Sequence, residues 1–201
     1  MARPIRLCPP APHWPDAFAA EQQRIASAIE AQPGLAFGSD YRLSHIGSTA
    51  VPGLWAKPII DMLLCVPTSA ALDECVSLLK QLGYLCKGEN GIVGRRYFVL
   101  PVGIAHWSAQ PWSVNSAPVH SEDRSHHLHV FVKGHPASDS HLAVRDYLRA
   151  HPAAIARYNE VKHHALTQSQ GQSDRYSAEK DPFVQQLVQD ALAWTHHQGR
   201  L

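Results

Sequence analysis

Apolar residues recur every three or four positions in two parts of the chain. Phe18, Ile25 and Ile29 share one face of a predicted helix, which we expect to begin at Pro15 because proline suits the first helical turn. A second helix is predicted over 69–82, with a threonine or serine at its start and a glycine after it. Each helix therefore has one face for burial against other elements.

Short runs rich in apolar and β-branched residues predict strands. These runs cover 42–46, 58–66, 84–86, 97–100 and 126–132. The last third of the chain has helical spacing instead, interrupted at prolines and at a glycine-containing stretch. Helices are predicted there over 139–150, 153–168 and 182–196. This order is typical of an α+β fold with a mixed sheet, helices and a helical C-terminal part.

Residues 101–125 show no period and contain proline, tryptophan, serine and histidine. A stretch of this length inside a compact domain is typical of a lid or a mobile excursion. Trp107 and Trp112 lie within it, and we expect them to close over a ligand. Trp14, Trp55 and Trp194 are interpreted as packing residues.

The amino-acid composition excludes several classes of protein. Of the 201 residues, 45% are hydrophobic and 17% charged, which argues against a disordered chain. The formal net charge of +1 argues against a nucleic-acid partner. No cysteine pair has Cys-x-x-Cys spacing, so we expect reduced thiols of a cytoplasmic protein. The longest apolar stretch, 58–67, contains Asp61 and is too short to cross a bilayer, so no membrane partner is expected.

The segment from His45 to Asp61 carries most of the chemistry. Gly47 and Ser48 directly follow a predicted strand. A glycine lets the backbone approach a ligand, and free N–H groups with a serine hydroxyl can cradle a phosphate. Asp61 interrupts a buried strand, where an ionised carboxylate is costly unless it is paired or metal-bound. This layout suits Mg²⁺; the alternative is a tight turn and one structural aspartate.

The same segment resembles the signature of a known family. His45-Ile-Gly-Ser-Thr-Ala-Val-Pro-Gly-Leu-Trp-Ala-Lys-Pro-Ile-Ile-Asp61 is similar to the signature of the GrpB family. The similarity covers nearly the whole chain. It includes His13-Trp14-Pro15, residues 127–130 and 145–152, and the pairs Tyr158 with Lys162 and Tyr176 with Lys180.

The resemblance implies a nucleotidyltransferase-like fold of the polymerase-β type. It implies a single domain over 1–201, with a core at about 15–135 and a helical part at about 138–197. It further implies that Gly47-Ser48 opens a helix under the phosphates and that Asp61 is the first metal carboxylate. In some bacteria a similar domain is fused to dephospho-coenzyme A kinase.

One position departs from the pattern of active nucleotidyltransferases, which usually carry Asp-x-Asp on the metal strand. Leu63 stands at the second carboxylate position and cannot bind a cation. His127 and His129 offer a replacement, because residues two apart on a strand share a face. With Asp61 they could bind Mn²⁺, Fe²⁺ or Zn²⁺. The alternative is a pair of hydrogen-bonded sheet histidines; His126 and the later histidines are expected on the surface.

Basic residues supply the counter-charge for an anionic ligand. Lys57 lies between the cradle and Asp61, and either Lys57 or Arg145 is expected to stabilise the developing negative charge. Lys162 and Lys180 follow on later helices. His45 adds a possible ligand contact beside the cradle. The alternative is solvated helix faces or ion pairs, such as Arg145 with nearby acids, and we prefer this alternative for Arg149.

These residues support three functional hypotheses. The first is an enzyme that binds a nucleoside triphosphate or another anionic small molecule with Mg²⁺ or Mn²⁺ and catalyses nucleotidyl or phosphoryl transfer. The second is a non-catalytic binding or accessory module related to coenzyme A metabolism, which Leu63 favours. The third is a metal-dependent cyclase or hydrolase that uses the face of His127 and His129.

Overall fold

The computed structural model describes residues 5–35, 37–102 and 124–199. The segment 103–123 lies outside the described residues, and with it Trp107, Trp112 and the predicted lid. The chain divides into two compact units. The sheet unit comprises Pro12–His45 and Ile59–Ser138, and the helical unit comprises Met1–Ala11, Ile46–Pro58 and Asp139–Leu201.

A five-stranded mixed sheet forms the centre of the sheet unit. Its strands are β1 (Arg42–Ile46), β2 (Ile60–Val66), β3 (Leu85–Cys86), β4 (Arg96–Pro101) and β5 (Arg124–Val132). The order across the sheet is β1-β2-β5-β4-β3. β2 pairs with β5 in parallel, whereas β4 is antiparallel to β5 and to β3. Because β2 is buried along most of its length, it is a central strand, as its continuous apolar run predicts.

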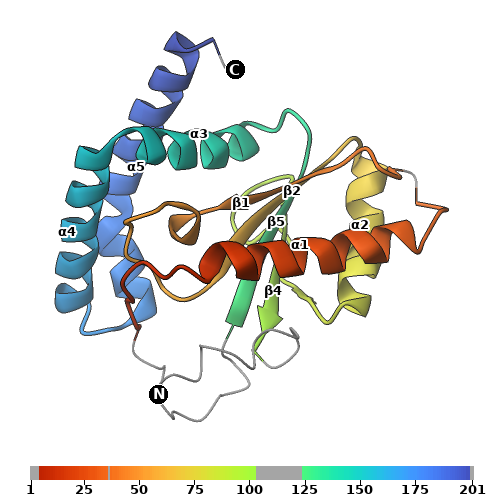
Figure 1. Cartoon of the computed structure of the whole chain (residues 1–201), viewed down its shortest axis with the longest axis horizontal. Helices are drawn as coiled ribbons and strands as arrows, with labels where there is room; N and C mark the ends of the chain where they lie inside the picture. The colour runs from red at the N-terminus through yellow and green to blue at the C-terminus, as the bar shows by residue number, and fades with distance from the viewer. Residues whose placement is uncertain (1–4, 36, 103–123, 200–201) are drawn as a thin grey trace. The chain divides into compact units, whose positions relative to one another are not determined.

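Two helices of the sheet unit follow the predicted apolar faces. α1 (Trp14–Glu30) has Pro15 in its first turn and buries Ile25 and Ile29. α2 (Ser69–Gln81) begins after Thr68, whose side-chain oxygen accepts from the backbone N–H of Ala71 at 3.2 Å. Figure 1 shows α1 extending across the strands of the sheet.

A buried polar network connects α1 to Tyr84, the residue directly before β3. Glu21 is 1% exposed, and its carboxylate accepts from the Arg24 guanidinium at 2.9 and 2.5 Å and from the Tyr84 hydroxyl at 2.7 Å. His126 lies near this network and is 0% exposed, so its predicted surface position is wrong. Burial lowers the pKa of His126 to about 4, which keeps this imidazole neutral.

The helical unit has its own core. α3 (Pro136–Ala150), α4 (Pro152–Gln168) and α5 (Ser173–His197) belong mainly to it, with a short 3-10 helix, η1 (Ser48–Ala50). α4 and α5 lie side by side (Figure 1). Their buried side chains pack with those of the 46–58 segment. The core consists of Val51, Leu54, Leu148, Tyr158 and Leu187.

α5 begins nine residues earlier than the sequence predicts, at Ser173 instead of 182. Pro182 lies inside the helix, where it removes one backbone donor without ending the helix. Tyr176, in the first part of α5, is 2% exposed. Its burial stabilises the turns before Pro182, so tertiary packing overrides the local signal.

The predicted α+β class, mixed sheet and helical C-terminal part are confirmed. All four cysteines are free thiols. The expected bounds of the core and of the helical part stay predictions; the contact clustering places Ile46–Pro58 with the helical unit. The single domain over 1–201 stays a prediction. None of the described helices is long and apolar enough to span a membrane.

Candidate functional site

Asp61 and His127 meet on one face of the sheet. They are directly opposite in the parallel pairing of β2 and β5. The Asp61 Oδ1 atom accepts from His127 Nδ1 at 3.0 Å, and the two side chains are 30% and 17% exposed. The predicted adjacency of these strands is therefore present, and it makes a carboxylate–imidazole pair.

The pair continues into a polar cluster on β4. Tyr97 packs with its ring 5.5 Å from that of His127 and 5.1 Å from that of His129. The Arg95 guanidinium lies 4.9 Å from the centre of the Tyr97 ring, and its terminal nitrogen is 3.3 Å from His129 Nδ1. We call the surface formed by Asp61, His127, His129, Tyr97 and Arg95 the Asp61 face.

Charges on this face act on the Tyr97 hydroxyl. Burial, followed by the Asp61 carboxylate, raises the pKa of Tyr97 to about 12. Arg124 and Arg95 act in the opposite direction. The phenol therefore keeps its proton near neutral pH and can donate a hydrogen bond.

The partners of the two histidines fix their tautomers. A guanidinium can only donate, so His129 Nδ1 accepts from Arg95 and the proton of the neutral ring sits on Nε2. A carboxylate can only accept, so His127 Nδ1 donates to Asp61. The Nε2 atom of His127 is buried and has no hydrogen-bond partner among the described residues. It therefore has a lone pair available in the neutral ring.

We expect nitrogen NMR of the two imidazoles to show different tautomers at neutral pH. His127 should carry its proton on Nδ1 and His129 on Nε2, because Asp61 and Arg95 select them. Spectra of ¹⁵N-histidine-labelled protein, assigned with His127→Gln and His129→Gln, measure this directly. The same tautomer in both rings would contradict the described contacts.

The three predicted metal ligands do not form one group. Over residues 5–35, 37–102 and 124–199, no set of three or more His, Cys, Asp or Glu side chains is placed to hold a metal ion. His129 faces Arg95, and its protonated Nε2 is no ligand in that tautomer. Asp61 and His127 remain the two neighbouring donors, and metal binding by them stays a prediction.

The predicted phosphate cradle lies in the helical unit. Gly47 has φ 68°, a left-handed conformation that favours glycine, and the 3-10 helix η1 follows it. Lys162 is 2% exposed and donates from Nζ to Ser48 Oγ at 2.6 Å and to the Trp55 carbonyl at 2.5 Å. Because Ser48 Oγ accepts from an ammonium, its hydroxyl proton is directed to another acceptor.

Other predicted residues have defined positions within their own units. The ammonium groups of Lys57 and Lys180 each lie 5.6 Å from the Tyr176 ring centre. Arg145 binds the neighbouring Asp146 with two nitrogens, at 2.7 and 3.0 Å, which fits the alternative of an acid partner. His45, in the sheet unit, is 9% exposed and stacks on Phe18 at 4.9 Å.

Arg149 has a structural contact that its exposed position does not suggest. Its guanidinium donates to the Ala50 carbonyl at 2.9 and 2.6 Å, which holds η1 against α3 within the helical unit. The prediction of a solvated Arg149 side chain therefore does not describe its guanidinium, which these hydrogen bonds hold in place.

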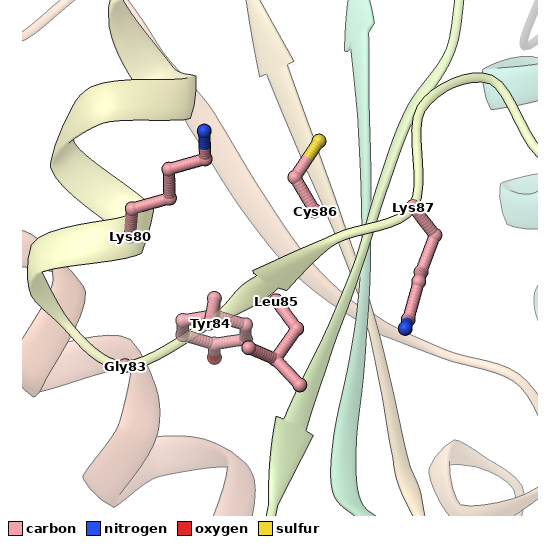
Figure 2. A pocket seen from close by; sticks show the side chains of 6 residues that line it. All are labelled: Lys80, Gly83, Tyr84, Leu85, Cys86 and Lys87. Carbon is pink, nitrogen blue, oxygen red and sulfur yellow. The ribbon is translucent and has the colours of Figure 1, made fainter.

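A cavity of about 450 Å³ opens beside the edge strand β3. Figure 2 shows Lys80 and Lys87 on opposite sides of it, with Tyr84, Leu85 and Cys86 between them. Its two cations do not converge, and none of the predicted site residues lines it. It is therefore a different place from the Asp61 face.

Sequence reasoning missed Arg95, Tyr97 and Arg124 as members of the polar cluster. Arg95 and Tyr97 share a face at a spacing of two, and in the antiparallel register Tyr97 is opposite His129. The alternation was visible in the sequence, but the strand partner was not. Only the pairing of β4 with β5 brings these groups together.

Comparisons with known proteins agree with the architecture. YqkA of Bacillus subtilis, a UPF0157 protein, is 34% identical over 182 residues, which are 90% of this chain and 45% of YqkA. A dephospho-CoA kinase of Mycolicibacterium paratuberculosis is 32% identical over 213 residues, covering 98% of this chain and 48% of the kinase. The chain thus spans about half the length of these relatives.

A solved structure and a family profile cover most of the chain. The crystal structure of conserved protein GrpB from Enterococcus faecalis has a TM-score of 0.72 and 29% identity, and the match covers 94% of this chain and 98% of that one. The profile described as GrpB protein matches residues 4–190. The extent of this match, together with the shared fold, shows that the chain belongs to the GrpB family.

Proposed function

We propose that this protein binds a nucleotide or a similar anionic small molecule together with a divalent cation, and that it catalyses nucleotidyl or phosphoryl transfer. The observation that carries the proposal is the Asp61–His127 pair on a central, otherwise buried part of the sheet. The Asp61 side chain is 30% exposed and can be reached by a ligand, and a carboxylate on an otherwise apolar strand is typical of a site that binds a charged group.

The donor atoms present fit a cation in part. The Asp61 carboxylate offers the oxygen lone pairs that His127 Nδ1 does not occupy, and such hard oxygen donors suit Mg²⁺ or Mn²⁺. The bond from His127 Nδ1 orients this carboxylate, because metal-binding carboxylates are in turn held by hydrogen bonds. Oxygen atoms of the ligand would complete the coordination. When bound, the ion would polarise the phosphoryl group.

The other residues have roles as follows in this proposal. Gly47, Ser48 and Lys162 bind phosphate oxygens, with the Ser48 hydroxyl donating because Lys162 occupies its acceptor side. Lys57 stabilises negative charge that develops during transfer. His45 and Arg145 are assigned only to ligand contact, since each already has a neighbouring partner.

The test is turnover of nucleoside triphosphates by Asp61→Asn. We expect pyrophosphate or phosphate release from ATP, GTP, CTP or UTP with Mn²⁺ to fall at least about tenfold, and Mn²⁺ binding measured by electron paramagnetic resonance to weaken. Asp73→Asn is the matched control, because Asp73 is an exposed partner of Arg96 outside the Asp61 face. Equal turnover in the Asp61→Asn and unmodified proteins would reject the mechanism.

A binding module without catalysis is the second candidate. Leu63, buried at 1% exposure on the metal strand, cannot supply the second carboxylate that two-ion transfer needs. The similarity to a dephospho-CoA kinase suggests coenzyme A precursors as ligands. A thermal-shift screen with dephospho-coenzyme A and nucleotides separates the two: stabilisation without any turnover favours the module.

A further inference from the structure

Arg95 is a buried cation with neutral partners. It is 5% exposed, and its guanidinium donates to the Glu89 carbonyl at 3.0 Å, to the Asn90 carbonyl at 2.5 Å and to His129 Nδ1 at 3.3 Å. The Tyr97 ring lies beneath it at 4.9 Å. Among the described residues, no carboxylate forms an ion pair with Arg95.

Such an arrangement is costly in a protein without a ligand. A guanidinium stays charged under all ordinary conditions, so burial cannot be relieved by loss of its proton. Carbonyl oxygens and an aromatic face satisfy part of its donors, but they do not neutralise the charge. Burial lowers the pKa of Arg95, because loss of water disfavours the charged guanidinium. An anion supplied from outside the described chain would remove it.

The side chain is also held ready for such an anion. The turn at Glu89 and Asn90 and the Tyr97 ring fix the plane of the guanidinium. Of its five N–H donors, three are used in these described bonds. The remaining two belong to the terminal nitrogens, where a planar oxyanion is bound most tightly.

His129 and Tyr97, the two groups of the Asp61 face that contact Arg95, are donors as well. His129 is held as a neutral ring with its proton on Nε2, because Arg95 occupies Nδ1. The Tyr97 phenol is a hydrogen-bond donor near neutral pH, and its ring lies 4.9 Å from the Arg95 guanidinium. Arg124 acts on the same hydroxyl as a second positive charge. These groups would donate to the oxygens of one anion.

We propose that Arg95, with His129 and Tyr97, is an oxyanion subsite that binds a phosphoryl or carboxyl group of the ligand. The subsite rests on the proposed function in one respect, namely that the Asp61 face is the ligand-binding surface. It changes the role of His129 from metal ligand to anion donor. In this subsite, Arg95 determines the specificity for anionic ligands.

The test is calorimetric titration of the full chain in EDTA with two probes, tripolyphosphate and citrate. We expect Arg95→Met to weaken binding of the preferred probe at least about tenfold, because hydrogen bonds to charged groups contribute this much. Arg95→Lys keeps a charge but loses the planar fork, so binding should weaken about threefold or more. The tighter probe identifies the oxyanion as phosphoryl or carboxyl.

Arg96→Met is the matched control. Arg96 directly follows Arg95 as the first residue of β4, and it pairs with exposed Asp73 at 3.1 Å. Its replacement should leave binding within about twofold of the unmodified protein. If Arg95→Met loses its fold in circular dichroism, Arg95→Lys decides the question, because it retains the positive charge and an aliphatic stem.

Three outcomes overturn the proposal. They are no binding of either probe to the unmodified protein, unchanged binding in the folded Arg95 variants, and equal loss in Arg96→Met. Failure here is distinct from failure of the proposed function, because the titration contains no metal ion and no turnover. Asp61→Asn removes a negative charge from the face and is expected to tighten binding in EDTA, whereas it should lower turnover with Mn²⁺.

Discussion

Replacing Glu21 with leucine is expected to lower the free energy of unfolding by roughly 3–5 kcal/mol. The carboxylate is 1% exposed and accepts from Arg24 and from the Tyr84 hydroxyl. Without it, the buried Tyr84 phenol and the partly buried Arg24 guanidinium are left with part of their donors unsatisfied. Urea denaturation followed by circular dichroism measures the loss.

The expected loss of stability is large because Glu21 is buried, and an exposed ion pair serves as the comparison. Arg96 and Asp73 are also paired, at 3.1 Å, but Asp73 is 70% exposed. Asp73→Ala should change stability by only about 0–1 kcal/mol, because water solvates the partner that remains. Similar losses in Glu21→Leu and Asp73→Ala would show that the Glu21 network contributes no more than a surface pair.

Lys162→Met should destabilise the helical unit by roughly 2–3 kcal/mol. The buried ammonium joins Ser48 Oγ and the Trp55 carbonyl to α4, and it lies 4.3 Å from the Tyr158 ring centre. Methionine fills the space of the aliphatic part of the lysine side chain but donates no hydrogen bond. Amide hydrogen exchange should therefore become faster over residues 48–55, while exchange in β5 keeps its rate.

Lys180→Met is the control for this prediction. Its ammonium lies 5.6 Å from the Tyr176 ring centre, and the side chain is more exposed than that of Lys162. The expected loss is about 1 kcal/mol or less, which is typical of such a contact with an aromatic ring. If exchange over 48–55 is unchanged in Lys162→Met, the lysine does not hold this segment, and its assignment to the cradle loses its support.

Most helices and strands followed from local patterns alone. The apolar spacing of α1 and the capping threonine of α2 are properties of short segments, so they survive in the fold. The start of α5 was missed because Pro182 is a strong local signal for a helix start. Burial of Tyr176 outweighs it, and no local pattern reports burial by distant residues.

The candidate site divides in the same way. The sequence alone determined the residue types at Gly47, Ser48 and Asp61, the alternation that places His127 and His129 on one face, and the missing carboxylate at Leu63. Only the tertiary structure decided which strands are neighbours. Parallel pairing of β2 with β5 joins Asp61 to His127, and antiparallel pairing of β4 with β5 brings Arg95 to His129. Periodicity specifies the face of a side chain, whereas its partner across the sheet depends on packing of the whole unit, which is why the metal ligand expected at position 129 lies against a guanidinium.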